Sequence, residues 1–104
     1  MRAETLKGHL DFLLLATVAG EPAHGYRIIE ELKRRSAGAF DLPEGTVYPA
    51  LHRLEASGLL ASAWAKDTAR RRRVYRLTAR GRRALASQRR EWRGFTNAVD
   101  AVVA

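Results

Sequence analysis

The sequence contains no cysteine and only three histidines among its 104 residues. Without cysteine, disulfide frameworks and thiolate metal sites are excluded, and the composition fits a reducing cytosol. The histidines, His9, His24 and His52, are dispersed, and no serine or carboxylate lies at a spacing typical of a catalytic triad. A glycine-rich phosphate-binding loop and a cluster of metal ligands are missing too. These absences argue against an enzyme and predict no catalytic residue, metal or other cofactor.

Long uninterrupted apolar runs are also missing. The N-terminal stretch MRAETLKGHLDFLLLATVAGEP is apolar in part, but His9 and Asp11 interrupt it and no small-residue cleavage pattern follows a basic start. This stretch is therefore typical of a core helix rather than of a signal or membrane segment. With 104 residues, of which 46% are hydrophobic, the chain is long enough and apolar enough for one small domain with a core. We expect a cytoplasmic protein with no membrane partner.

Acidic residues are scarce in the second half of the chain. Residues 1–58 contain seven Lys/Arg and eight Asp/Glu, whereas residues 59–104 contain twelve Lys/Arg and three Asp/Glu. The net charge of +8 therefore comes from the second half. Such a concentrated positive field favours a polyanion, with nucleic acid the first candidate and an anionic membrane surface the second. A merely solvated basic surface in an arginine-rich proteome is the alternative.

The hydrophobic pattern predicts a mainly α fold with a small β-hairpin. An apolar helix over about 7–19 is ended by Gly20 and Pro22, and a second helix covers about 23–35. After a break at 36–45, a third helix that has Pro43 in its first turn runs to about Ser57. Residues 59–67 and 70–78 tolerate the alternation of two strands, and Thr78 is a good N-cap for a last helix that begins at about Ala79.

Two short helices joined by a turn and followed by a hairpin are typical of a winged helix-turn-helix. In this arrangement, the N-terminal part of the second helix enters the major groove and the hairpin, or wing, reaches the neighbouring backbone. Gly45 and Pro49 are poor helix formers at the start of that second helix. An early proline costs few hydrogen bonds because the first amides have no intrahelical partner, and glycine lets the backbone approach a phosphate.

This arrangement nominates two sets of residues for contact with DNA. On the third helix, the residues away from the core face are Thr46, Tyr48, Pro49, His52 and Arg53, which could contact base edges, a thymine methyl or phosphates. At the hairpin tip, the basic residues are Lys66, Arg70, Arg71, Arg72 and Arg73, whose mutual repulsion a phosphate backbone would relieve. The alternatives are that Tyr48 packs on a neighbouring helix and that the arginine run is a solvated surface.

The last helix carries a heptad seam. Its members are spaced 3, 4, 3, 4 and 3 apart and are Leu85, Gln88, Trp92, Phe95, Val99 and Val102. A monomer would leave large apolar side chains in water at a cost of roughly 1.5–3 kcal/mol each, so we expect a homodimer. Packing of this helix back on the first helix of its own subunit is the alternative. Trp92 could also serve as an aromatic plate for a flat ligand, or be plain interface core.

Several spaced motifs together resemble the PadR family of bacterial transcriptional regulators in its short form. They are HGYRIIEEL at 24–32, GTVYPALHRLEASGLL at 45–60, Trp64 and RRRVYRLTARGRRAL at 71–85. The resemblance implies a winged-helix dimer, joined through the C-terminal helix, that represses a promoter by occupying an inverted repeat. It also implies phosphate contacts near His24, Gly25 and Tyr26, a recognition helix at Thr46, Tyr48 and Pro49, and a wing at Lys66 and the arginines.

Family members that sense drugs or phenolic compounds resemble this chain at Trp92, and Phe12 and Leu15 would then line the same cavity. We therefore expect a DNA-binding unit over 1–78 and a dimerisation helix over 79–104. The expected partners are double-stranded DNA and a second copy, and a small planar aromatic molecule is a further candidate. Such a protein would associate with the nucleoid when bound to DNA. The competing hypothesis is a protein-interaction or membrane-surface module that uses the winged helix only as a scaffold.

Overall fold

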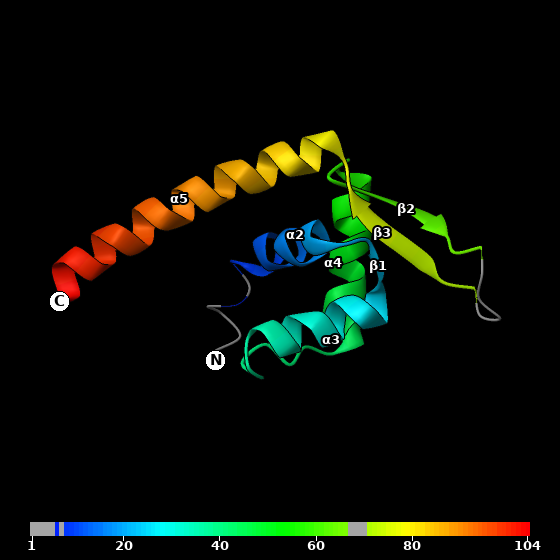
Figure 1. Cartoon of the computed structure of the whole chain (residues 1–104), viewed down its shortest axis with the longest axis horizontal. Coiled ribbons are helices and arrows are strands. Elements are labelled where there is room, and N and C mark those ends of the chain that lie inside the picture. Colours follow the sequence, from blue (N-terminus) through cyan, green and yellow to red (C-terminus); the bar gives the residue numbers. More distant parts are fainter. Residues whose placement is uncertain (1–5, 7, 67–70) are drawn as a thin grey trace.

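The computed structural model of the chain describes residue 6 and residues 8–66 and 71–104. In chain order, its elements are α2 (Leu10–Gly20), β1 (Ala23–His24), α3 (Gly25–Arg35), α4 (Glu44–Ala56), β2 (Leu60–Trp64), β3 (Arg73–Leu77) and α5 (Ala79–Val103). Figure 1 shows α2, α3 and α4 gathered into one body, with the β2–β3 wing on one side and α5 running away on the other. This is the winged helix-turn-helix with a long C-terminal helix that the sequence predicts.

The core lies between the three short helices and the sheet. The start of α5 completes it. The buried residues of this core are Leu14, Leu15, Val18, Ile28, Leu32, Val47, Ala50, Leu51, Leu54, Leu60, Tyr75, Leu77 and Leu85. α2 is apolar nearly all round because neighbours cover several of its sides. It contacts α3, α4, β3 and α5. On α4, the buried residues recur at helical spacing and turn the opposite side of this helix toward solvent.

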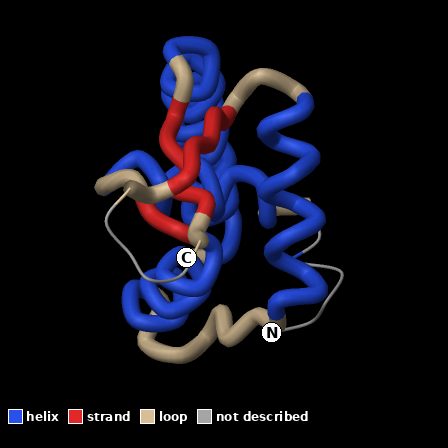
Figure 2. Tube along the Cα trace, turned by 90° about the vertical axis from the view of Figure 1, so that its right-hand side faces the viewer, coloured by secondary structure: helices blue, strands red, loops and turns tan. Residues whose placement is uncertain are grey.

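The sheet has three antiparallel strands in the order β1-β3-β2, rather than the two-stranded hairpin expected from the sequence. Ala23 and His24, which the pattern assigns to a helix, pair with Tyr75 and Val74 of β3. A strand of two residues is too short for an alternating pattern, so only its pairing partner reveals it. In Figure 2 the three strands run side by side next to the helices. This pairing holds the start of α3 against the base of the wing.

α5 begins as a part of the core and then leaves it. The hydroxyl of Thr78 accepts a hydrogen bond from the amide of Gly81 (3.0 Å) and donates one to the carbonyl of Gly58 (2.7 Å), which confirms the expected N-cap. Leu85 is only 2% exposed and packs in the core of its own subunit, so its assignment to an intersubunit seam is wrong for the isolated subunit. Beyond Leu85, α5 extends the molecule to 53 × 28 × 20 Å.

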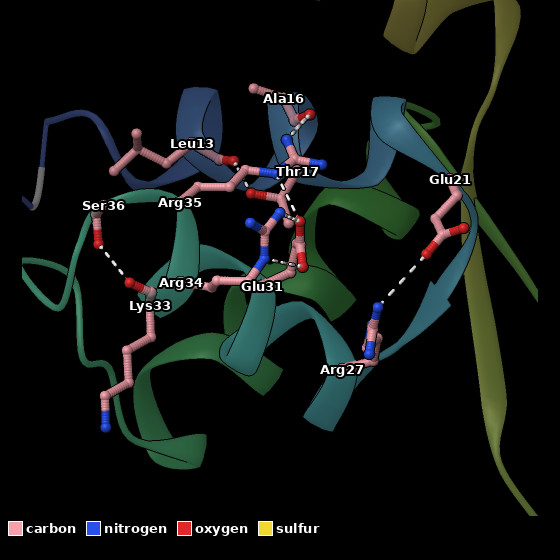
Figure 3. A network of polar contacts seen from close by, with 10 residues as sticks. All are labelled: Leu13, Ala16, Thr17, Glu21, Arg27, Glu31, Lys33, Arg34, Arg35 and Ser36. Atoms are coloured by element: carbon pink, nitrogen blue, oxygen red, sulfur yellow. Dashed lines mark hydrogen bonds and ion pairs between the residues drawn. The ribbon is translucent and has the colours of Figure 1, made fainter.

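Polar contacts fix the crossing of α2 and α3 (Figure 3). Glu31 pairs with Arg34 and Arg35 one turn further along α3, and Arg35 also donates to the carbonyl of Ala16 on α2 (3.3 Å). The hydrogen bonds from Arg34 and Arg35 lower the pKa of Glu31 to about 2. Glu31 is therefore charged at every pH near neutrality, and Arg35 is held across the two helices.

Candidate nucleic-acid interface

A cleft of about 730 Å³ lies where the start of α3, the outer side of α4 and the wing meet. Its lining is His24, Gly25, Tyr26, Glu44, Tyr48, His52, Arg71, Arg72, Arg73 and Tyr75. Most of the residues that the sequence nominates for DNA contact are thereby brought together from three separate stretches of the chain. Among the residues that the structure describes, three arginines and one carboxylate, that of Glu44, line this cleft. The cleft therefore favours an anion.

The other nominated residues that the structure describes do not line the cleft. Thr46 is half-buried and Pro49 is exposed on α4, and Lys66 is exposed just beyond β2. Arg70 lies outside the described residues. Arg53 is not on the cleft side, because its guanidinium pairs with Asp11 of α2 (2.6 Å) and lines a different cavity. The expectation that Arg53 faces the groove with His52 is therefore wrong for this subunit.

Pro49 lies inside α4 rather than in its first turn. α4 begins at Glu44 with Pro43 as the N-cap, so Pro49 is the sixth helical residue. Only the first four amides of a helix lack an intrahelical partner, so a residue with an amide at this position would bond to the carbonyl of Gly45. Proline cannot donate there. The exposed start of α4 consequently has a backbone carbonyl without its usual amide donor.

Tyr48 is half-buried against the start of α3 instead of standing free toward solvent. A Cβ atom placed on Gly25 would lie 2.3 Å from Cε1 of the Tyr48 ring, so the tyrosine occupies the space that a larger residue would need. Burial, followed by the charge of Glu44, raises the pKa of the Tyr48 phenol. The hydroxyl is thus a neutral hydrogen-bonding group. This contact fixes the distance between the two helices of the helix-turn-helix.

His24 joins the start of α3 to the wing. Its Nδ1 accepts the hydrogen bond of the Arg27 amide (3.2 Å) and caps α3, while its Nε2 lies 3.2 Å from a guanidinium nitrogen of Arg72. When Nδ1 is the acceptor, a neutral ring carries its proton on Nε2, which then faces a second donor. Partial burial and then the charge of Arg72 lower the pKa of His24, with Arg27 acting in the same direction and Glu30 opposing it.

The lowered pKa of His24 predicts a loss of stability on acidification. The unfolded chain, where the pKa is near 6.5, binds more protons than the folded chain, so this contribution is complete above pH 6.5 and is lost as the pH falls toward the folded pKa. His24→Asn keeps an N-cap but does not titrate. Urea unfolding at pH 8 and 5.5, at one protein concentration, is expected to show a smaller acid-induced loss in this variant. Equal losses in the two proteins would contradict this role of His24.

Sequence reasoning misses three residues of this interface. Glu44 and Tyr75 line the cleft, and Trp64 lies beside two of the wing arginines. The only available signal for Glu44 is its place as an acid in the first turn of α4, which is common for purely helical reasons. Tyr75 and Trp64 are typical strand residues, so nothing in the pattern distinguishes them from aromatic residues of any other strand.

A second cavity, of about 480 Å³, separates α2 from the middle of α5. Its lining is Gly8, His9, Asp11, Phe12, Arg53, Gln88, Glu91, Trp92 and Phe95. The Trp92 ring lies 5.2 Å from His9, 6.3 Å from Phe12 and 6.1 Å from Phe95, centroid to centroid. Leu15, which was expected here, is fully buried in the core and does not line the cavity. Gln88 lines the cavity. Its Oε1 is buried and has no hydrogen-bond partner among the described residues.

Comparison with known proteins decides the family. Residues 14–87 match the family described as "Transcriptional regulator PadR-like family". The chain belongs to this family. Over 77 residues it is 44% identical to the transcriptional regulator Rv3488 of Mycobacterium tuberculosis, and the match covers 74% of this chain and 69% of the relative. The resemblance drawn from the spaced motifs is thereby confirmed.

Solved structures agree with the family and the fold. A PadR family regulator from Eggerthella lenta is 32% identical with a TM-score of 0.83, over 96% of this chain and 86% of that one. A regulator from Clostridium thermocellum shares the fold at a TM-score of 0.88 and 24% identity, over 100% and 99% of the two chains. PadR-like proteins are transcriptional regulators and not enzymes. Within the described residues, no helix of this PadR-like chain has both the length and the apolar character needed to cross a bilayer.

Proposed function

We propose that this PadR-like regulator is a homodimeric repressor that occupies an inverted-repeat operator in double-stranded DNA. In this proposal residues 1–78 bind DNA and residues 79–104 form the dimerisation helix. The start of α4 enters the major groove, and the arginines of the wing and the start of α3 meet phosphates on either side. The cleft supports this function because it gathers the basic and hydrogen-bonding residues of three separate segments into one concave surface.

The outer half of α5 supports the dimer. Trp92, Phe95, Val99, Val102 and Val103 are between 38% and 85% exposed in the subunit, although all are apolar. Four of them continue the heptad seam, and Val103 adjoins it. Figure 1 shows this part of α5 running away from the other helices. Among the described residues, its aromatic contacts with the body are those of Trp92 with His9 and Phe12. An apolar stripe of this kind on a projecting helix requires a partner surface, and a second copy offers the same stripe.

Removing two wing arginines should weaken binding to every duplex. In the double variant Arg71→Ala/Arg72→Ala, affinity is expected to fall at least about tenfold for specific and scrambled duplexes alike, because phosphate contacts carry no sequence information. If the wild-type dimer neutralises roughly eight phosphates, log K falls with log salt at a slope of about −7. Replacing two arginines in each subunit removes four phosphate contacts from the dimer, which should make this slope shallower by about 3.6. Fluorescence anisotropy between 50 and 200 mM salt measures both quantities.

The matched control removes the same charge elsewhere. Arg76 and Arg89 line a groove beside Val18 and Leu85, outside the cleft, so Arg76→Ala/Arg89→Ala should leave the salt slope nearly unchanged. Thr46→Ala, on α4, should instead reduce the preference for the specific over the scrambled duplex. Equal affinity of the wild type for both duplexes would exclude a sequence-specific repressor and favour an interaction module.

We also propose that the α2–α5 cavity accepts a small planar aromatic effector between Phe12, Trp92 and Phe95. Its supporting features are its volume and the three aromatic rings around it. In a Trp64→Phe background, Trp92 is the sole tryptophan, and its fluorescence should be quenched saturably by proflavine or by a phenolic acid. The Trp92→Phe protein, which retains Trp64, is the control and should show no saturable quenching. The same weak, linear quenching in both proteins would contradict an effector site at Trp92.

A further inference from the structure

The described arginines at the end of the wing have three different sets of partners. Arg71 places its guanidinium carbon 4.5 Å from the centroid of the Trp64 ring. Arg72 turns toward His24 at the start of α3. Arg73 donates to the hydroxyl of Ser62 (2.9 Å) and also lies over the Trp64 ring, at 4.9 Å. A merely solvated run of like charges would not be expected to show such an ordered division of contacts.

Arg73 is tied to α4 through the wing. The Ser62 hydroxyl donates to a carboxylate oxygen of Glu55 (2.6 Å), and the same carboxylate lies 3.9 Å from Arg73. Glu55 is in the last turn of α4, and Arg73 pairs directly with Trp64 across the two strands. These contacts connect the end of α4 to the indole ring. The orientation of Trp64 is therefore coupled to the orientation of α4.

Trp64 itself contributes little to the core. It is 48% exposed at the end of β2, and it is not part of the buried cluster. Guanidinium groups stack on aromatic faces, and their coplanar N–H groups can then still donate to the oxygens of an anion. Stacking also orders a flexible side chain before binding, which lowers the entropy cost of contact. An exposed tryptophan beside Arg71 is suited to these two tasks.

We propose that Trp64 is a positioning residue for DNA binding, which holds the Arg71 guanidinium ready for a backbone phosphate beside the half-site. In this proposal Arg73 links the indole ring to Glu55 of α4 and does not itself contact a phosphate. This inference rests on the proposed DNA-binding function. It adds Trp64 to the interface and reassigns Arg73.

A double-mutant cycle tests whether Trp64 acts through Arg71. Trp64→Leu keeps an apolar side chain but removes the aromatic face, and it should weaken duplex binding about five- to tenfold and flatten the salt slope by up to about 1.8, for two phosphates per dimer. In an Arg71→Ala background, the same replacement should cost less than about twofold more, because the shared contact is already lost. Trp64→Phe should recover most of the wild-type affinity.

Controls separate this role from a merely structural one. Arg76→Ala removes the same charge from β3 outside the cleft. In this background, Trp64→Leu should weaken duplex binding by the same factor as in the wild type, because the two residues are not coupled. Trp64→Leu should also leave the thermal unfolding temperature within a few degrees of the wild-type value. The inference would be overturned if the affinity loss of the double variant equalled the product of the losses caused by Trp64→Leu and Arg71→Ala alone. It would also be overturned if Trp64→Leu left the affinity and the salt slope unchanged. Either result would leave DNA binding itself intact. A wild type that binds no duplex would instead remove the proposed function.

A second measurement needs no change at Trp64. In a Trp92→Phe background, Trp64 is the sole tryptophan and reports on its own environment. Its emission is expected to shift when Arg71 is replaced by alanine and again when a duplex is added to the protein with Arg71 intact. Emission that is indifferent to both changes would contradict the stacking of Arg71 on Trp64.

Discussion

Replacement of both Trp92 and Phe95 by alanine is expected to convert the protein from a dimer to a monomer. Both side chains are exposed in the subunit, at 41% and 60%, so their truncation removes intersubunit burial without opening the core. Each side chain occurs twice in a symmetric dimer. We expect the dissociation constant of the dimer to rise at least about 100-fold, equivalent to about 2.8 kcal/mol. Sedimentation velocity over a concentration series measures this change.

Matched replacements on the same helix provide the control. Arg93 and Asn97 are exposed on α5 outside the seam, so Arg93→Ala/Asn97→Ala should remain a dimer. The monomeric variant should unfold as one cooperative unit and lose most of its affinity for a two-half-site duplex, because each monomer carries a single reading unit. An unchanged sedimentation coefficient in Trp92→Ala/Phe95→Ala would exclude the seam as the dimer interface. Truncation at Gly81 is a poorer test, since it also removes Leu85 from the core.

Gly81→Ala should destabilise the protein by at least about 2 kcal/mol, although alanine is the better helix former by about 1 kcal/mol. A Cβ atom on Gly81 would lie 2.0 Å from the carbonyl oxygen of Leu59 and 3.0 Å from its carbonyl carbon. Both are backbone atoms, and the same carbonyl accepts a hydrogen bond from the Thr78 amide. The first turn of α5 must therefore move away from the turn between α4 and β2. Urea unfolding measures the cost.

Gly94 is the natural comparison, because it is on the same helix and a Cβ there would meet no described atom within 4 Å. Gly94→Ala is expected to raise the free energy of unfolding by about 0.5–1 kcal/mol, with the dimer unchanged. The pair thus separates helix propensity from the close approach at Gly81. A Gly81→Ala protein as stable as the wild type would show that α5 is not held against Leu59 as described.

Local rules were sufficient for most of the elements. Thr78 and Gly20 mark helix ends through capping and stop signals that depend only on nearby residues, and the alternating pattern that begins at residue 59 marks the wing. The resemblance to the PadR family added what these parts are expected to do, because their order already follows from the hydrophobic pattern. β1 could not be predicted, because two residues become a strand only through pairing with β3.

The errors at the site have a common cause. Helical spacing indicates on which side of a helix a residue lies, but it does not indicate which other element packs against that side. The heptad seam includes Leu85, yet the start of α5 turns that position into the core. Arg53 follows His52 on an exposed side of α4, but Asp11 on another helix draws it to the other cavity. Leu15 follows the cavity-lining Phe12 by about one turn of α2 and is still fully buried in the core. Only tertiary contacts distinguish these outcomes.

The central claim is that a symmetric pair of α4–wing units reads DNA. Selection of bound duplexes from a random pool tests this claim most directly, because it reports the half-site, its symmetry and its spacing together. We predict an enriched inverted repeat whose half-site centres are about one helical turn, 10–10.5 base pairs, or a multiple of it apart. Enrichment of a single asymmetric site, or of no sequence at all, would contradict the account.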